Sequence, residues 1–166
     1  PDSVTPAFAL LFTGYGTKVG LVPLHNWLPH AHAEGPTPVS AVLSGLLLNV
    51  ALYAVVRSKV LVDGALRNGF AGNLMMGFGL LSVVLAAFFL LRQKDVKRLF
   101  AYSSIEHMGI ITFAFGMGGA VANFAALLHM TVHSLTKSAI FYAVGHATQK
   151  AGTQLMDGIR GLMRVS

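Results

Sequence analysis

Long apolar stretches separated by short polar connections make up most of the chain. A helix needs about 20 mostly apolar residues to cross a bilayer, and five stretches of the sequence approach or exceed this length. We expect transmembrane spans at residues 4–28, 39–56, 70–91, 99–116 and 121–146. The alternating period of β-strands does not compete with them. The pattern predicts an all-α integral membrane protein, with residues 1–166 forming a single transmembrane domain of about five helices.

The composition agrees with a membrane protein. Hydrophobic residues make up 54% of the chain and charged residues 11%, against about 25% charged in typical soluble domains. The absence of Cys excludes disulfides, thiolate metal sites and Cys nucleophiles. No haem or flavin signature occurs, so we expect no cofactor, no catalytic residue and no redox chemistry in this chain. Because it begins at Pro1 and ends in a polar run, we interpret it as a piece of a larger helical bundle.

The basic residues lie mainly in the short connections. The formal net charge is +6, but basic residues placed between apolar spans are typical of topology signals rather than of a nucleic-acid surface. The connections that share a side with RQKDVKR at 92–98 hold the larger excess of Lys and Arg. The positive-inside rule places that side in the cytoplasm. We predict a multi-pass protein of the cell (inner or plasma) membrane that contacts lipid and no nucleic acid.

A few titratable residues fall inside the predicted spans. A charge at the bilayer centre costs at least about 2.5 kcal/mol on insertion scales, so such residues usually face a protein interior or a wet cavity and mark an ion or proton path. Burial also favours the neutral forms of Lys and Glu, which brings them within reach of reversible protonation. The residues concerned are Lys18, Glu106, His107, His129, His133 and Lys137.

Three of these residues recur at every fourth position. His129, His133 and Lys137 lie on one slowly drifting face of a helix and extend over about 12 Å of its length. With water and the flanking hydroxyls of Thr136 and Ser138, they can pass a proton along that face. The alternative is that they hydrogen-bond neighbouring helices and fix the packing. We favour the proton relay, because three titratable groups are aligned.

Lys18 lies within the first predicted span and is followed by Pro23. Proline removes a helix hydrogen bond and frees a carbonyl, so this segment is a candidate broken helix of the kind that transporters use at ion sites. The alternative is a proline kink with a structurally paired lysine. We favour a proton site at Lys18 with a helix break at Pro23.

Histidines also cluster at the end of the first span. Together with an acid they surround Trp27, and the cluster indicates either a metal site or an interfacial segment with an aromatic anchor. We favour the interfacial segment and assign no metal ligands, and we keep His25 as a secondary position of the proton path. The cluster consists of His25, His30, His32 and Glu34.

Three ordered motifs resemble one family of membrane proteins. They are KVGLVPLHNWLPHAHAEGPTPVSAVLSGLLL at 18–48, RQKDVKRLFAYSSIEHMG at 92–109 and LLHMTVHSLTKSAIFYAVGH at 127–146. Together they are similar to the antiporter-like membrane subunits of respiratory complex I, Mrp sodium/proton antiporters and membrane-bound hydrogenases. SSIEHMG at 103–109, together with Asn49, is most similar to the F component of hydrogenase-4 and formate hydrogenlyase complexes.

The resemblance implies a larger bundle built from inverted repeats, in which Lys18 matches the lysine of a broken helix. In the family this lysine pairs with a glutamate, which would lie outside this chain, and the pair gates a half-channel. By the symmetry of the repeats, Glu106 would be the counterpart of that glutamate, with His107 beside it as a proton acceptor. Asn49 departs from the family pattern, because many relatives carry Lys or His there. A neutral amide cannot store a proton, so water or another side chain must complete the path at Asn49.

The row at His129, His133 and Lys137 matches the central hydrophilic axis of the family. We therefore predict a proton-translocating subunit of a group-4 hydrogenase or formate hydrogenlyase, partnered by other membrane subunits and by a peripheral hydrogenase or dehydrogenase arm. The alternative within the same fold is an NADH-quinone oxidoreductase or Mrp antiporter subunit. More distant alternatives are a metal-ion transporter using His129 and His133, with Glu106 completing a zinc site, and a scaffold whose buried polar groups only pack helices.

Overall fold

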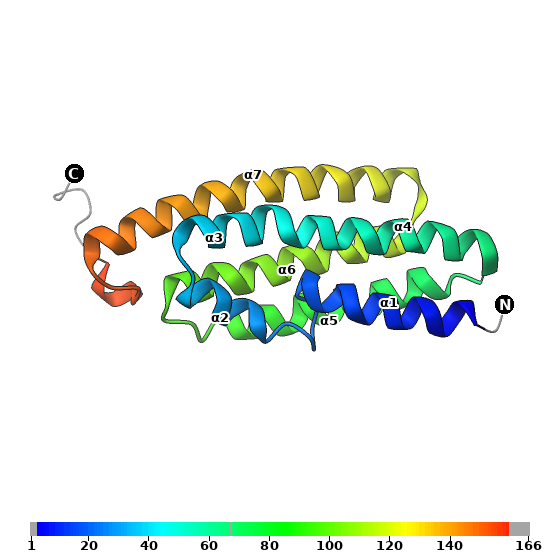
Figure 1. Ribbon diagram of the computed structural model, residues 1–166, viewed down its shortest axis with the longest axis horizontal. Helices are drawn as coiled ribbons and strands as arrows, with labels where there is room; N and C mark the ends of the chain where they lie inside the picture. Colours follow the sequence, from blue (N-terminus) through cyan, green and yellow to red (C-terminus); the bar gives the residue numbers. More distant parts are fainter. Residues whose placement is uncertain (1–2, 67, 160–166) are drawn as a thin grey trace.

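The computed structural model describes residues 3–66 and 68–159, which form an elongated bundle of helices (Figure 1). In chain order the elements are α1 (Val4–Val19), α2 (Trp27–Glu34), α3 (Thr37–Val42), the π-helical turn η1 (Leu43–Leu47), α4 (Leu48–Leu66), α5 (Phe70–Leu90), α6 (Val96–Met117), α7 (Gly119–Ala151) and the 3₁₀ turn η2 (Met156–Gly158). The described residues form no β-strand beyond one isolated bridge between Asp95 and Leu155. Arg67, Arg160 and Arg164, which add to the charge of the connections and the tail, lie outside the described residues.

The stretch expected as the first span, residues 4–28, is divided into two helices. Gly20 adopts the left-handed conformation at φ 80°, and its N–H donates to the carbonyls of Gly16 and Thr17. The indole Nε1 of Trp27 also donates to the Thr17 carbonyl, at 2.7 Å. The first residue of α2 therefore satisfies a carbonyl at the end of α1, where intrahelical partners run out. Pro23 lies in the connection between the two helices.

α3, η1 and α4 form one continuous helical segment, Thr37–Leu66. Within the described chain, this 30-residue segment and the 21-residue α5 are long and apolar enough by themselves to cross a membrane. α1 is shorter, with 16 residues. α6 and α7 carry five of the six titratable residues singled out from the sequence, which lowers their mean hydropathy.

α5 and α6 approach each other closely through facing glycines. A Cβ added to Gly79 would lie 2.7 Å from the carbonyl oxygen of Gly109, and one added to Gly109 would lie 2.8 Å from the carbonyl oxygen of Gly79. Neither neighbour is a flexible side chain, so the contact depends on the missing methyl groups. Small residues that allow such backbone contact are typical of helix pairs in membranes.

α6 and α7 carry the candidate site and lie beside each other along the bundle (Figure 1). α6 begins after Asp95, whose side chain accepts a hydrogen bond from the Arg98 N–H at 3.0 Å and so caps the helix. α7 is 33 residues long and also packs against α3 and η1. Its length allows one helix face to contact several elements in succession.

Candidate functional site

The titratable row on α7 lines a small cavity between α6 and α7. The cavity has a volume of about 160 Å³, which is room for several water molecules at about 30 Å³ each. We call it the inner cavity. Four of the six titratable residues singled out from the sequence surround it. Its lining consists of Phe100, Ser103 and His107 from α6 and His129, Val132, His133, Thr136, Lys137 and Ile140 from α7.

His107 and His129 form a hydrogen-bonded pair across the two helices. The Nδ1 of His107 lies 2.9 Å from the Nε2 of His129, so one of these nitrogens donates and the other accepts. The ring of His133 lies 5.7 Å from that of His107, measured between centroids. Neither ring nitrogen of His133 has a partner among the described residues. Such unpaired buried groups cost about 1–3 kcal/mol each, so these nitrogens favour water in the inner cavity.

Lys137 is 3% exposed and is held by neutral acceptors. Its Nζ donates to the Ser103 hydroxyl at 2.9 Å and to the Phe100 carbonyl at 3.3 Å. Among the described residues, Lys137 forms no salt bridge with a carboxylate. An ammonium held by neutral groups is bound less strongly than one paired with a carboxylate. Lys137 can therefore exchange its proton without breaking an ion pair.

Asn49 lies at a different cavity. Its Nδ2 donates to the carbonyls of Gly45 at 3.1 Å and of Met130 at 3.3 Å, which joins α4 to the backbone of α7. The Gly45 carbonyl also accepts a hydrogen bond from the Ser134 hydroxyl. The Oδ1 of Asn49 is buried without a partner among the described residues, at the edge of a cavity of about 300 Å³ whose lining shares no residue with the inner cavity. Asn49 thus offers a water site beside the row rather than within it.

The remaining two titratable residues do not line the inner cavity. Lys18 lies in the last turn of α1 and is exposed, rather than lying in the middle of a continuous span. The reason is that α1 ends at Gly20, well before the predicted limit. Glu106 lies on α6 between Ser103 and His107, which both line the inner cavity. It is half-buried and makes no hydrogen bond to other described residues. Lys18 and Glu106 can therefore contact groups that lie outside the inner cavity.

His25 and His32 have unequal surroundings. His25 is mostly buried beside the rings of Phe89 and Tyr102. His32 is completely buried and stacks on Phe141 of α7, with ring centroids 4.5 Å apart. The prediction that the histidine cluster is an interfacial segment does not account for the complete burial of His32. The signal available in the sequence is the spacing of four between Leu28 and His32, which places both on one helix face.

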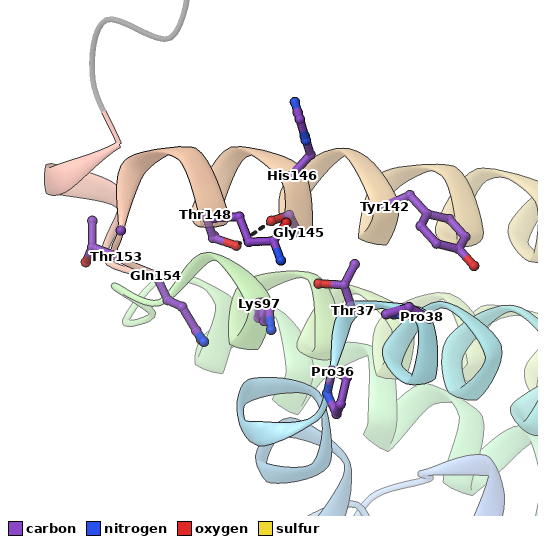
Figure 2. A pocket seen from close by; sticks show the side chains of 12 residues that line it. Pro36, Thr37, Pro38, Lys97, Tyr142, Gly145, His146, Thr148, Thr153 and Gln154 are labelled. Atoms are coloured by element: carbon purple, nitrogen blue, oxygen red, sulfur yellow. Dashed lines mark hydrogen bonds between the residues drawn. The ribbon is translucent and has the colours of Figure 1, made fainter. Parts of the chain in front are cut away.

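A larger and more open cavity lies at the end of the bundle (Figure 2). Its volume is about 730 Å³, and we call it the end cavity. Thr37 and Lys97 lie beneath α7 in Figure 2, whereas His146 points away. Lys97, which the sequence pattern places in a connection between spans, is 7% exposed and donates from Nζ to the Gly35 carbonyl at 3.2 Å. The remaining lining comes from Pro36, Pro38, Tyr142, Gly145, Thr148, Gln149, Gly152, Thr153 and Gln154.

The geometry gives little support to the metal-site alternative. Across the described ranges, no group of three or more His, Cys, Asp or Glu side chains is arranged to hold a metal ion. His107 and His129 direct ring nitrogens at each other rather than at a common point. The arrangement is suited to passing protons between hydrogen-bonded or water-linked groups.

These features define a class of protein: an all-α membrane protein with titratable side chains buried between its helices. The family model described as "NADH:quinone oxidoreductase/Mrp antiporter, TM" matches residues 3–166. The chain belongs to this family of transmembrane proteins. The membership confirms the all-α membrane fold and the resemblance carried by the three sequence motifs.

Known relatives refine the comparison. The chain is 62% identical over 159 residues to the Hydrogenase-4 component F homolog of Methylacidiphilum infernorum (isolate V4), covering 96% of this chain and 33% of the relative. It is 32% identical over 178 residues to Hydrogenase-4 component B of Escherichia coli (strain K12), covering 99% of this chain and 26% of that protein. The chain thus spans about a third or less of the length of these relatives.

Two solved structures share the fold. One is an archaeal respiratory membrane complex, the membrane-bound sulfane sulfur reductase, with a TM-score of 0.83 and 31% identity over 91% of this chain and 31% of the matched one. The other is the Mrp complex from Dietzia sp. DQ12-45-1b, with a TM-score of 0.83 and 31% identity over 94% of this chain and 17% of the matched one. Both similar chains belong to membrane complexes.

Proposed function

We propose that this chain forms part of the proton path of an antiporter-like subunit in a membrane-bound redox complex of the hydrogenase-4 type. The observation that carries the proposal is the inner cavity, where three histidines and one lysine from two helices surround one space of about 160 Å³. A structural role alone does not call for four titratable groups around one cavity. Similarity to a Hydrogenase-4 component F homolog supports the hydrogenase type.

The geometry supports a stepwise transfer along α7. The hydrogen bond between His107 and His129 lets a proton move from one ring to the other. Water beside the unpaired nitrogens of His133 then connects this pair to Lys137. Lys137 holds the proton against Ser103 until a change elsewhere in the complex favours its release. Lys18 and Glu106 serve as further proton sites that face groups outside the inner cavity.

The partners and the location belong to the same proposal. Other membrane subunits and a peripheral hydrogenase arm would carry the metal clusters and the electrons, and this chain would supply the proton path. The complex would lie in the cell membrane, with residues 92–98 on the cytoplasmic side. An NADH-quinone oxidoreductase or Mrp-type assembly is the second candidate, supported by the similarity to the Mrp complex.

The test is proton uptake by liposomes that contain the assembled complex with its full-length subunit. Lys137→Met removes the titratable amine, and we expect the proton uptake per redox turnover to fall by roughly tenfold or more, because a positioned acid or base contributes at least that much to proton transfer. Lys94→Met, at an exposed position, is the matched control and should behave as wild type. Normal uptake by an assembled Lys137→Met complex would contradict the proposal. Copurification of a hydrogenase arm distinguishes the hydrogenase type from the second candidate.

A further inference from the structure

The row of every fourth residue on α7 continues past Lys137 to Phe141 and Gly145. His133, Lys137, Phe141 and Gly145 are all buried on the same helix face. Lys137 lines the inner cavity and Gly145 lines the end cavity. Phe141 lies between Lys137 and Gly145. Of its two neighbours in sequence, Ile140 lines the inner cavity and Tyr142 lines the end cavity. Along α7, a single apolar position therefore separates the two cavities.

His32 of α2 lies against that apolar position. Its ring stacks on the Phe141 ring at an interplanar angle of 14°. His32 is fully buried, and neither ring nitrogen has a hydrogen-bond partner in the described part of the chain. An apolar side chain could stack on Phe141 without leaving two buried polar atoms unpaired. The histidine is therefore poorly explained by packing.

The backbone around His32 is fixed from three directions. The Ser40 hydroxyl donates to the His32 carbonyl at 3.3 Å, and Gln154 donates to the Ala33 carbonyl at 3.2 Å. Lys97 donates to the Gly35 carbonyl just beyond α2. Contacts from α3, α6 and the segment after α7 thus hold the backbone of α2 around His32 in place.

Each cavity is also lined by one lysine, Lys137 at the inner cavity and Lys97 at the end cavity. Because His32 stacks on Phe141, it lies beside α7 between the stretches of that helix that line the two cavities. On its buried face, α7 offers no titratable side chain at this place. An imidazole there can accept a proton on one nitrogen and donate from the other.

We propose that His32 transfers protons between the end cavity and the inner cavity, around the apolar position Phe141. This inference rests on the proposed function. Water in the end cavity gives a proton to one ring nitrogen, and the N–H on the other nitrogen gives its proton, through water, to the neutral amine of Lys137. One N–H bond forms and one breaks on the ring, Lys137 becomes an ammonium, and His32 is left in its other tautomer. A half-turn about its Cβ–Cγ bond then directs the N–H toward the inner cavity and the free nitrogen toward the end cavity, which readies the ring for the next transfer.

The decisive variant is His32→Phe in the assembled complex, because it keeps an aromatic ring against Phe141 and removes both nitrogens. We expect the complex to assemble with unchanged or higher thermal stability and the proton uptake per redox turnover to fall by roughly tenfold or more. His30→Phe makes the same change at an exposed position of α2 and should behave as wild type. If His32→Phe fails to assemble, His32→Gln makes the same test, since an amide does not titrate.

An exchange of the two stacked residues separates proton transfer from packing. His32→Phe combined with Phe141→His keeps both side chains and returns an imidazole to the same place from the other helix. We expect this double variant to recover a substantial part of the proton uptake lost in His32→Phe. Normal uptake in His32→Phe, or an equal loss in the single and the double variant, would overturn the inference.

The outcome is distinguishable from failure of the proposed function. If Lys137→Met abolishes proton uptake while His32→Phe leaves it normal, the function stands and only the role of His32 is wrong. If wild-type complex takes up no protons, the proposed function itself fails.

Discussion

His107 on α6 and His129 on α7 are joined by a hydrogen bond of 2.9 Å between Nδ1 and Nε2. The two helices are connected by a short turn at Gly118, yet the pair lies well away from that turn, between residues separated by 22 positions. Because one hydrogen atom is shared between the two rings, the protonation of one depends on that of the other. We therefore expect the two histidines to act as a single proton-binding unit.

This coupling predicts non-additive losses. His107→Gln and His129→Gln should each reduce the proton uptake of the assembled complex, because each interrupts the same shared step. The double variant should lose little more than the more damaging single change. The measurement is the rate of proton uptake per redox turnover in liposomes. Two independent losses that multiply would show that the histidines act separately.

Lys18 is expected to be a site that stores and releases a proton. Lys18→Met should abolish proton translocation and leave the complex assembled, since the side chain is exposed in the last turn of α1 and contributes little packing. Lys18→Arg keeps the positive charge but does not release a proton near neutral pH. Both variants should therefore fail in the liposome assay. Full activity of Lys18→Arg would mean that only the charge matters.

Glu106 is expected to titrate during turnover. Glu106→Gln keeps the shape of the side chain and removes the titration, so redox turnover should continue with less linked proton movement. The structural alternative is a hydroxyl network with Tyr102 and Ser103. Tyr102 instead stacks on Phe89, and Ser103 accepts a hydrogen bond from Lys137. Undiminished proton movement per turnover in Glu106→Gln would return this residue to a structural role.

The contact between α5 and α6 predicts a strong effect of a single methyl group. Gly79→Ala would place Cβ 2.7 Å from backbone atoms of Gly109 and Phe113, so the helices must separate. We expect a loss of stability of about 1–3 kcal/mol, as for other overpacked cores. Gly77→Ala lies on the same helix with no atom within 4 Å of the new Cβ and is the matched control. Thermal unfolding of the detergent-solubilised complex would reveal the difference; equal stability of the two variants would contradict it.

The sequence is sufficient to place the row on α7, because the geometry of a helix fixes which residues share a face. It cannot supply the partners of that row. The pairing of His107 with His129, and of Lys137 with Ser103, depends on the register of α6 against α7, which tertiary contacts decide. Local patterns contain no information about that register.

The break after α1 and the burial of His32 differ from the sequence-based expectation for the same reason. Pro23 indicates an interruption, but the helix ends earlier, at Gly20, because Gly20 adopts a left-handed conformation and Trp27 completes the end from outside the helix. The polar neighbours of His32 in sequence favour an interfacial segment. Its burial results from the packing of α2 beneath Phe141, far along the chain.

The π-helical turn η1 sets the rotational phase between the two halves of the Thr37–Leu66 segment. Each residue of an α-helix advances the direction of the side chains by about 100°, and a π turn accommodates one extra residue without ending the helix. Thr37, before the turn, lines the end cavity, and Asn49, after it, reaches the Met130 carbonyl. Deletion of one residue between Leu43 and Leu47 would remove this extra residue and leave an ordinary α-helix, with the side chains beyond it facing as they do now. A one-residue gap at this place in a related sequence is therefore compatible with the same side chains facing α7.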